Sequence, residues 1–297
     1  MVAKIIDGSA IAQQVRDEVA ERVRTLATRG VEPGLAVVLV GEDPASVSYV
    51  RGKTRDAAAI GMRSETIRVP ANVTQEALLR LVNELNENPG WHGVLVQLPL
   101  PGHIDERAIT EAVVPEKDVD GLHPVNVGRL FRGEPGYLSC TPHGVIQMLL
   151  RSGHDPAGKH AVICGRSNLV GKPLAGLLMQ KRRGGNATVT VCHTGTPDLG
   201  VHTRQAEILI AVMGRPGTIT ADMVRDGAVV IDVGVNAIPD ATKKSGQRLV
   251  GDVDFDAVAQ KAAAITPVPG GVGPMTRAML LWNTVIAASG GPESLDR

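Results

Sequence analysis

The sequence has few aromatic residues and no net charge, and each shortage excludes a class of partner. Phe, Trp and Tyr together make up only 2% of the 297 residues, which argues against modules that bind nucleic acid by stacking bases on aromatic rings. The formal net charge at pH 7 is zero, so no overall field attracts nucleic acid or an anionic membrane. We therefore expect neither nucleic acid nor a membrane among the partners.

Cysteines and long hydrophobic runs are also scarce. The three cysteines, Cys140, Cys164 and Cys192, lie far apart and form no C-x-x-C pair, which argues against a zinc site and a disulfide framework. No segment reaches the roughly 18 consecutive apolar residues of a membrane-spanning helix, and the first ten residues lack the apolar run of a secretion signal. These features predict a cytoplasmic protein with reduced thiols and no bound metal.

What the sequence does contain is an alternation of helical and strand-like segments. In the first half, apolar residues recur at helical spacing between Ile11 and Leu26. Two later stretches are continuous and apolar, as in buried strands: LAVVLVG at 35–41 and GVLVQLPLP at 93–101. Between these strands, Ser46 is the expected N-cap of a helix. The first half is therefore predicted to be an α/β domain.

The second half carries a denser series of short strands. These segments are rich in β-branched residues without strict polar alternation, as expected for a parallel sheet covered on both faces. They are HAVICG at 160–165, ATVTVC at 187–192, ILIAVMG at 208–214 and AVVIDVG at 228–234. A helix is predicted between the first two, over 171–181. This arrangement predicts a doubly wound, Rossmann-like nucleotide-binding domain.

The last helix of the chain is expected to pack back on the first domain. Its apolar residues share one helical face: Ala278, Leu281, Trp282, Val285 and Ile286. The predicted organisation is therefore α/β with two α/β domains. Residues 1–140 together with 275–297 form the first domain, and residues 141–274 form the Rossmann-like second domain.

The segment VICGRSNLVGKP joins a strand to a helix and is a candidate phosphate loop. Gly165 allows a sharp turn, and the helix N-terminus offers free N–H groups to a phosphate. Because Ser167 occupies the middle glycine position of G-x-G-x-x-G, the loop alone fits either nucleotide binding or a plain turn. The following strand ends without the acid typical of NAD binding, and Arg166 can pair with a 2′-phosphate. NADP is therefore favoured over NAD, unless Arg166 is only a solvated surface charge.

Three polar features of the first half have both a functional and a structural interpretation. Tyr49 and Lys53 share one helical face, but the tyrosine could simply cover the lysine stem. Gln97 ends an apolar strand, where its amide must find a partner within the structure or in a ligand. Asp118 and Asp120, in PEKDVDG, could be solvated acids of a turn, since the segment does not match a calcium loop.

Taken in order, these motifs resemble those of one family. The segments EDPASVSYVRGK, GVLVQLPLP, PEKDVDGLHPVN, CTPHGV, GRSNLVGKP, IDVGVN, GDVDF and TPVPGGVGPMT have the order and spacing of bifunctional methylenetetrahydrofolate dehydrogenase/cyclohydrolases of the FolD type. The resemblance covers nearly the whole chain. It implies an enzyme of one-carbon metabolism that oxidises 5,10-methylenetetrahydrofolate with NADP⁺ and hydrolyses the methenyl product to 10-formyltetrahydrofolate.

The resemblance also implies partners and binding residues. The first domain and the C-terminal helix would hold the folate, the second domain would bind NADP, and the protein would be a homodimer active in tetrahydrofolate interconversion and purine biosynthesis. The motif positions implied to be catalytic, which also bind substrate, are Lys53, Tyr49, Gln97 and Asp120. Other implied substrate-binding positions are Val96, Leu98, Pro269, Gly270, Gly271, Val272 and Gly273, and the implied cofactor contacts are Gly165, Arg166, Ser167, Thr194 and Val235.

In this interpretation Tyr49 offers a flat apolar face to the folate ring system, and Lys53 handles the proton of the attacking water. Burial and the Gln97 amide would lower the pKa of Lys53, as general acid–base catalysis requires. The chain departs from the family at Arg55, where many members have a second lysine, and in a longer segment at 180–186 that could shift a cofactor contact. Two alternatives stay open: a single-activity NADP-dependent dehydrogenase, and a non-catalytic nucleotide-binding protein of the same fold.

Overall fold

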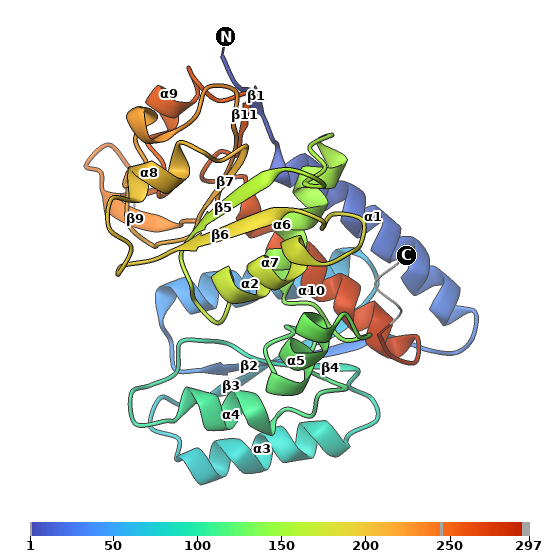
Figure 1. Cartoon of the computed structure of the whole chain (residues 1–297). Helices are drawn as coiled ribbons and strands as arrows, with labels where there is room; N and C mark the ends of the chain where they lie inside the picture. The colour runs from blue at the N-terminus through green and yellow to red at the C-terminus, as the bar shows by residue number, and fades with distance from the viewer. Residues whose placement is uncertain (1, 244–245, 293–297) are drawn as a thin grey trace. The chain divides into compact units, whose positions relative to one another are not determined.

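The computed structural model describes residues 2–243 and 246–292, and the chain forms two compact units (Figure 1). Unit 1 contains the N-terminal residues through Ala12 and residues 141–276, and unit 2 contains residues 13–140 and the segment from Arg277. The chain passes between the units within helices α1 (Gly8–Ala27), α6 (Cys140–Arg151) and α10 (Val272–Ala288). None of the helices in the described ranges is long and apolar enough to cross a membrane.

A three-stranded parallel sheet forms the centre of unit 2, in the order β3–β2–β4. Its strands are β2 (Gly34–Val40), β3 (Arg63–Val69) and β4 (Gly93–Val96). The central strand β2 is buried at every position, as expected for a continuous apolar run between two helical layers. No pattern in the sequence indicated β3, because its residues RSETIRV are mostly polar and lie at the edge of the sheet.

Helices cover both faces of this sheet. Apolar residues of α3 (Gln75–Glu87) and α4 (Glu106–Ala112) pack on one face, and these helices lie below the sheet in Figure 1. Helix α2 (Pro44–Ala59) packs against β2 and β3. The short helix α5 (Pro124–Arg132) follows α4.

The predicted start of α2 is wrong by a few residues. Asp43, not Ser46, is the N-cap, because the Asp43 carboxylate accepts the backbone N–H of Ser46 at 2.8 Å. Pro44 then occupies the first helical turn, where its missing N–H costs no hydrogen bond. The helix still presents Lys53 on its buried side, so the position of the lysine in the fold is unaffected.

Unit 1 is built on a six-stranded sheet in which every pairing is parallel, in the order β1–β11–β8–β7–β5–β6. The strands are β1 (Lys4–Ile5), β5 (His160–Cys164), β6 (Thr188–Cys192), β7 (Ile208–Ala211), β8 (Val229–Asp232) and β11 (Ala264–Ile265). A separate antiparallel hairpin consists of β9 (Asn236–Pro239) and β10 (Gln247–Val250).

Helical segments also cover this sheet, as the prediction of a doubly wound domain requires. Helix α7 (Gly171–Met179) packs against β5 and β6. The remaining elements are α8 (Leu199–Thr203), α9 (Phe255–Val258) and the 3₁₀-helix η1 (Ala221–Met223). Apolar residues of these three elements pack in one cluster with residues of β5, β7 and β8. The predicted α/β class, with a Rossmann-like parallel sheet in the second half, is confirmed.

The N-terminal residues belong with unit 1, whereas the sequence interpretation placed them in the first domain. The reason is that β1 pairs with β11, with Lys4 opposite Ala264 and Ile5 opposite Ile265. A strand of two residues has no periodicity that a sequence pattern could reveal.

The C-terminal helix α10 packs in unit 2 from Arg277 onward, as predicted. Its residues Ala278, Leu281 and Val285 are fully buried. The side-chain amide of Asn283 donates to the carbonyl oxygens of Val119 and Leu138, at 2.8 and 2.9 Å. These bonds tie the helix to the segment that carries the two aspartates of the PEKDVDG motif.

Candidate active site

A buried lysine and a glutamine amide form the centre of the polar cluster in unit 2. Lys53, on α2, is only 5% exposed, and its Nζ donates to Oε1 of Gln97 at 2.9 Å. Gln97 immediately follows β4, and its Nε2 donates to the carbonyl oxygen of Leu98 at 2.7 Å. This second bond orients the amide so that its oxygen faces the lysine.

The surroundings of Lys53 lower its pKa. Burial lowers the pKa of the Lys53 ammonium, whereas the nearby Asp120 raises it and Arg277 lowers it further. The ammonium also lies 5.3 Å from the centroid of the Tyr49 ring, as expected for residues four apart on one helix. Four residues are implied to be catalytic. Three of them, Tyr49, Gln97 and Asp120, are therefore neighbours of the fourth, Lys53.

Asp118 differs from the solvated acid that the sequence suggested. It is buried, and its carboxylate accepts the backbone N–H of His123 at 2.8 Å and the side-chain amide of Asn126 at 2.9 Å. Burial raises the pKa of Asp118 to about 7, although these hydrogen bonds act to lower it. Asp118 thus organises the turn before α5, while Asp120 is half-exposed and remains accessible to a ligand.

The other residues implied to bind substrate fall into two groups. In unit 2, Val96, Leu98 and Asp120 line one small cavity of about 20 Å³. The loop from Pro269 to Gly273 belongs to unit 1. Within that unit, the loop is tied to the start of α1, because the carbonyl oxygen of Gly270 accepts the N–H of Ser9 at 3.0 Å.

Helix α10 begins inside this glycine-rich segment, at Val272. A side chain at Gly271 could not be accommodated, because a Cβ atom would lie 2.5 Å from the carbonyl oxygen of Pro267. The glycine therefore allows the chain to turn tightly into the helix.

The candidate phosphate loop of unit 1 is shaped by close backbone contacts. Gly165 follows β5 with φ +137°, and a Cβ atom there would lie 2.2 Å from the carbonyl oxygen of Val212. At Gly171, the first residue of α7, a Cβ atom would lie 2.2 Å from the carbonyl oxygen of Gly165. The Ser167 hydroxyl accepts the N–H of Val170 at 3.2 Å. The loop therefore passes close to the helix N-terminus, the geometry that suits a phosphate group.

The remaining cofactor candidates lie at the same edge of the sheet. Arg166 and Thr194 are exposed, and each is the second residue after its strand, β5 or β6. Val235 follows β8 and is 60% exposed. Ligands of doubly wound sheets bind at this carboxyl edge, where the strand order reverses beside β5. The arrangement fits a bound dinucleotide with a negatively charged group near Arg166.

Two buried aspartates that the sequence analysis did not single out hold this edge together. The Asp252 carboxylate accepts the backbone N–H groups of Met213, Gly214 and Arg215, at 2.5, 3.0 and 2.8 Å. Asp232, at the end of β8, accepts the N–H of Asp252 at 3.0 Å. The motifs IDVGVN and GDVDF contain these residues, but no local pattern reveals that their carboxylates bind distant backbone.

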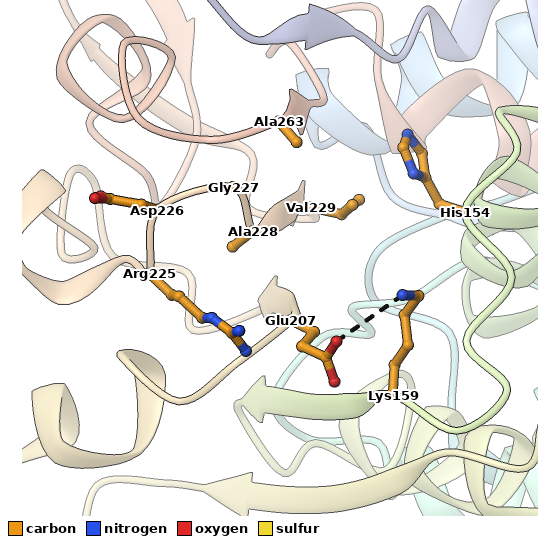
Figure 2. Close-up of a pocket in the computed structure, with 9 residues that line it drawn as sticks. All are labelled: His154, Lys159, Glu207, Arg225, Asp226, Gly227, Ala228, Val229 and Ala263. Atoms are coloured by element: carbon orange, nitrogen blue, oxygen red, sulfur yellow. Dashed lines mark ion pairs between the residues drawn. The ribbon is translucent and has the colours of Figure 1, made fainter. Parts of the chain in front are cut away.

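The opposite, amino edge of the sheet has a hollow of about 220 Å³ that is lined by charged residues (Figure 2). Lys159 and Glu207 face each other there, with Nζ and Oε1 3.9 Å apart. Glu207 also accepts the backbone N–H of His160 at 3.0 Å, and Asp226 pairs with Lys261. The charged groups at the starts of the strands therefore bind one another or the backbone. Arg166, at the carboxyl edge, is exposed.

Family models and relatives agree with this geometry. Residues 6–120 match the model for the tetrahydrofolate dehydrogenase/cyclohydrolase catalytic domain, and residues 139–290 match its NAD(P)-binding domain. The bifunctional protein FolD of Chloroherpeton thalassium is 55% identical over 95% of this chain and 97% of its own length. That of Dehalococcoides mccartyi is 56% identical over 97% of both chains.

Solved structures give the same result. The bifunctional FolD dehydrogenase/cyclohydrolase of Campylobacter jejuni is 46% identical, with a TM-score of 0.91 over 97% of this chain and 99% of that one. The FolD of Trypanosoma brucei, solved with NADP cofactor and an inhibitor, is 44% identical, with a TM-score of 0.92 over 98% of both chains. The chain belongs to the tetrahydrofolate dehydrogenase/cyclohydrolase family.

Proposed function

We propose that this protein oxidises 5,10-methylenetetrahydrofolate to 5,10-methenyltetrahydrofolate with NADP⁺ and hydrolyses the methenyl form to 10-formyltetrahydrofolate. The observation that carries the proposal is the buried Lys53, held by an oriented Gln97 amide in a chain that matches both family domains. A dehydrogenase alone needs mainly positioning of the two reactants. A buried amine with a lowered pKa is, in contrast, suited to moving a proton, as hydrolysis demands.

Unit 1 binds NADP in this proposal. When bound, NADP⁺ supplies the hydride acceptor of the oxidation. Gly165 lets the backbone approach the cofactor closely, and Ser167 fixes the start of α7. Arg166 pairs with the 2′-phosphate through its planar guanidinium, and Thr194 and Val235 contact the cofactor at the same edge.

Unit 2 performs the proton transfer. One N–H of the Lys53 amine donates to Gln97, which fixes the nitrogen while its lone pair stays available in the neutral form. Lys53 then accepts a proton from the water that attacks the methenyl carbon. Asp120 accepts hydrogen bonds from the pterin edge, and Tyr49 offers its ring face to the folate.

The supporting residues extend this assignment. Val96 and Leu98 flank Gln97 and contact the substrate, and the Pro269–Gly273 loop also binds it. The unit with Lys53 is the folate-binding and catalytic domain, and the unit with Gly165 is the NADP-binding domain. The protein acts as a cytoplasmic homodimer and supplies one-carbon units, including those of purine biosynthesis; the family resemblance supports this part.

The test is to separate the two reactions with Lys53→Gln. Glutamine keeps the approximate length and the hydrogen-bonding capacity of the side chain but cannot titrate. We expect hydrolysis of the methenyl form to fall by on the order of 10²-fold or more, the scale of a lost acid–base group. NADPH formation from the methylene substrate should remain measurable, because hydride transfer does not need the amine.

Lys117→Gln is the matched control. Lys117 is also a lysine of unit 2 with a pKa lowered by burial, but its Nζ donates to backbone carbonyls of Leu85 and Asn88. Its replacement should leave hydrolysis nearly unchanged. Hydrolysis at the native rate by Lys53→Gln would overturn the proposed function of the lysine.

A further inference from the structure

A buried ion pair lies on the helix that carries Lys53. Asp56 follows Lys53 by three residues on α2, so the two side chains lie on neighbouring positions of one helical face. Asp56 is only 5% exposed, and its Oδ2 accepts the Nε–H of Arg277 at 2.7 Å. The Arg277 side chain is itself 20% exposed. Removal of one partner from a pair this well shielded leaves an uncompensated buried charge, which costs more than the loss of a surface ion pair.

The stem of Arg277 also crosses α2 at Gly52. A Cβ atom at that position would lie 3.3 Å from Cδ and 3.4 Å from Nε of Arg277, so the glycine makes room for the arginine. Gly52 and Asp56 are four residues apart and therefore on one helical face. Arg277 thus contacts α2 on both sides of Lys53 along the chain.

The charges around Lys53 come from several elements. Asp120 lies in the segment before α5, Cys140 begins α6, and Arg277 lies in α10. Burial lowers the pKa of Lys53 most strongly, Asp120 and Cys140 raise it, and Arg277 lowers it. The Asp56 carboxylate offsets the arginine charge at the same place.

We propose that Arg277, held by Asp56, is a positioning residue for Lys53: the ion pair fixes α2 against α10 and so keeps the lysine amine on Gln97. The inference rests on the proposed function of Lys53 in hydrolysis. It adds that an arginine outside the substrate-binding motifs sets both the place and the charge state of that lysine.

Opposite changes to the pair should move the pH dependence of hydrolysis in opposite directions. Arg277→Met keeps an apolar stem but removes the cation, so the pH of half-maximal methenyl hydrolysis should rise. Asp56→Asn leaves the cation without its carboxylate, so that pH should fall. In both variants we expect the hydrolysis rate at the optimum to drop by roughly tenfold, less than the 10²-fold that a 1 Å displacement can cost.

Two further variants separate positioning from general stability. Arg277→Lys restores a cation and should return the half-maximal pH toward the native value. Arg55→Ala is the matched control, because Arg55 contacts the other oxygen of Asp56 at 3.1 Å but its side chain is 72% exposed. Its removal should leave the pH profile of hydrolysis in place.

The outcomes distinguish this inference from the proposed function. If Lys53→Gln loses hydrolysis but Arg277→Met and Asp56→Asn keep the native pH profile, the positioning role is wrong and the function of Lys53 stands. A shift of both variants in the same direction would also overturn the positioning role. If Lys53→Gln hydrolyses at the native rate, the proposed function itself fails.

Discussion

The two functional regions of this protein are built from different chemical groups: side chains in unit 2 and backbone in unit 1. In unit 2, side chains form the site: a buried lysine, an amide that accepts from it and a nearby carboxylate. In unit 1, the backbone forms the site, because Gly165 and Gly171 allow close approach and Asp252 holds a turn by three N–H groups. The first arrangement suits proton transfer and the second suits binding of a phosphate-bearing cofactor.

This difference predicts that each region can be damaged without the other. A substitution that closes the backbone approach in unit 1 should stop oxidation and spare hydrolysis, since hydrolysis of the methenyl form needs no dinucleotide. Replacement of Lys53 in the side-chain cluster should do the reverse, since oxidation does not need its amine.

The largest effect is expected from Gly165→Ala. A Cβ atom would lie 2.2 Å from the Val212 carbonyl oxygen at φ +137°, so the loop must shift. We expect NADP-dependent oxidation to fall by on the order of 10²-fold, the scale of a 1 Å displacement, while methenyl hydrolysis persists. Both rates are followed by absorbance on one preparation.

Gly227→Ala is the control for backbone strain. Gly227 also has a positive φ, +76°, but nothing lies within 4 Å of an added Cβ. This variant should keep NADP-dependent oxidation. Equal losses of oxidation and hydrolysis in Gly165→Ala would contradict the separation of the two regions.

A smaller effect is expected from Arg166→Ala. Loss of a charged hydrogen bond should weaken NADP⁺ binding by about 1.5–3 kcal/mol, whereas NAD⁺, which lacks the 2′-phosphate, should change little. Lys172→Ala is the matched control, because the Lys172 ammonium is already bonded to Asn168 at 2.7 Å. Titration of each variant with both cofactors measures the difference. Equal weakening of NADP⁺ and NAD⁺ would show that Arg166 does not read the phosphate.

The smallest expected effect is on the pH dependence of thermal stability, and it concerns one buried carboxyl group in each unit. Burial raises the pKa of Asp118 to about 7 and that of Asp232 to about 6. Each pKa lies above the ordinary 3.8, so folding favours the protonated form. The associated stability is fully present below that ordinary value and is lost as the pH rises through the folded pKa.

Asp118→Asn should therefore flatten the pH dependence of Tm between about pH 4 and 7, and Asp232→Asn between about pH 4 and 6. The expected change is about 2–4 °C for each kcal/mol involved, measured by thermal unfolding across that range. A slope as steep in the variants as in the native protein would contradict the assignment.

The sequence predicted the fold well wherever apolar residues are continuous. The apolar residues of the strands around Leu35, Ile163 and Ile210 are buried, and their β-branched composition needs no further context. The edge strand β3 and the two-residue β1 escaped prediction, because one is polar and the other too short to show a period.

The candidate site likewise contains some contacts that the sequence predicts and others that it does not reveal. Tyr49 and Lys53 are neighbours on a helix, so their spacing alone predicts their contact. The bond from Lys53 to Gln97 spans 44 residues, and only the resemblance to the family linked the two. Asp252 and Arg277 act through partners far away in sequence, and no local pattern reveals such contacts.

The central claim is that Lys53 is a buried amine whose pKa is lowered enough to move a proton. The most direct measurement is an NMR titration of protein labelled with ¹³C at the lysine side chains, with Lys53→Gln to assign its signal. We predict that the Lys53 signal titrates at a pH below the ordinary lysine value of 10.5 and below that of the exposed lysines of the same sample. A Lys53 signal that titrates together with the exposed lysines would contradict the account.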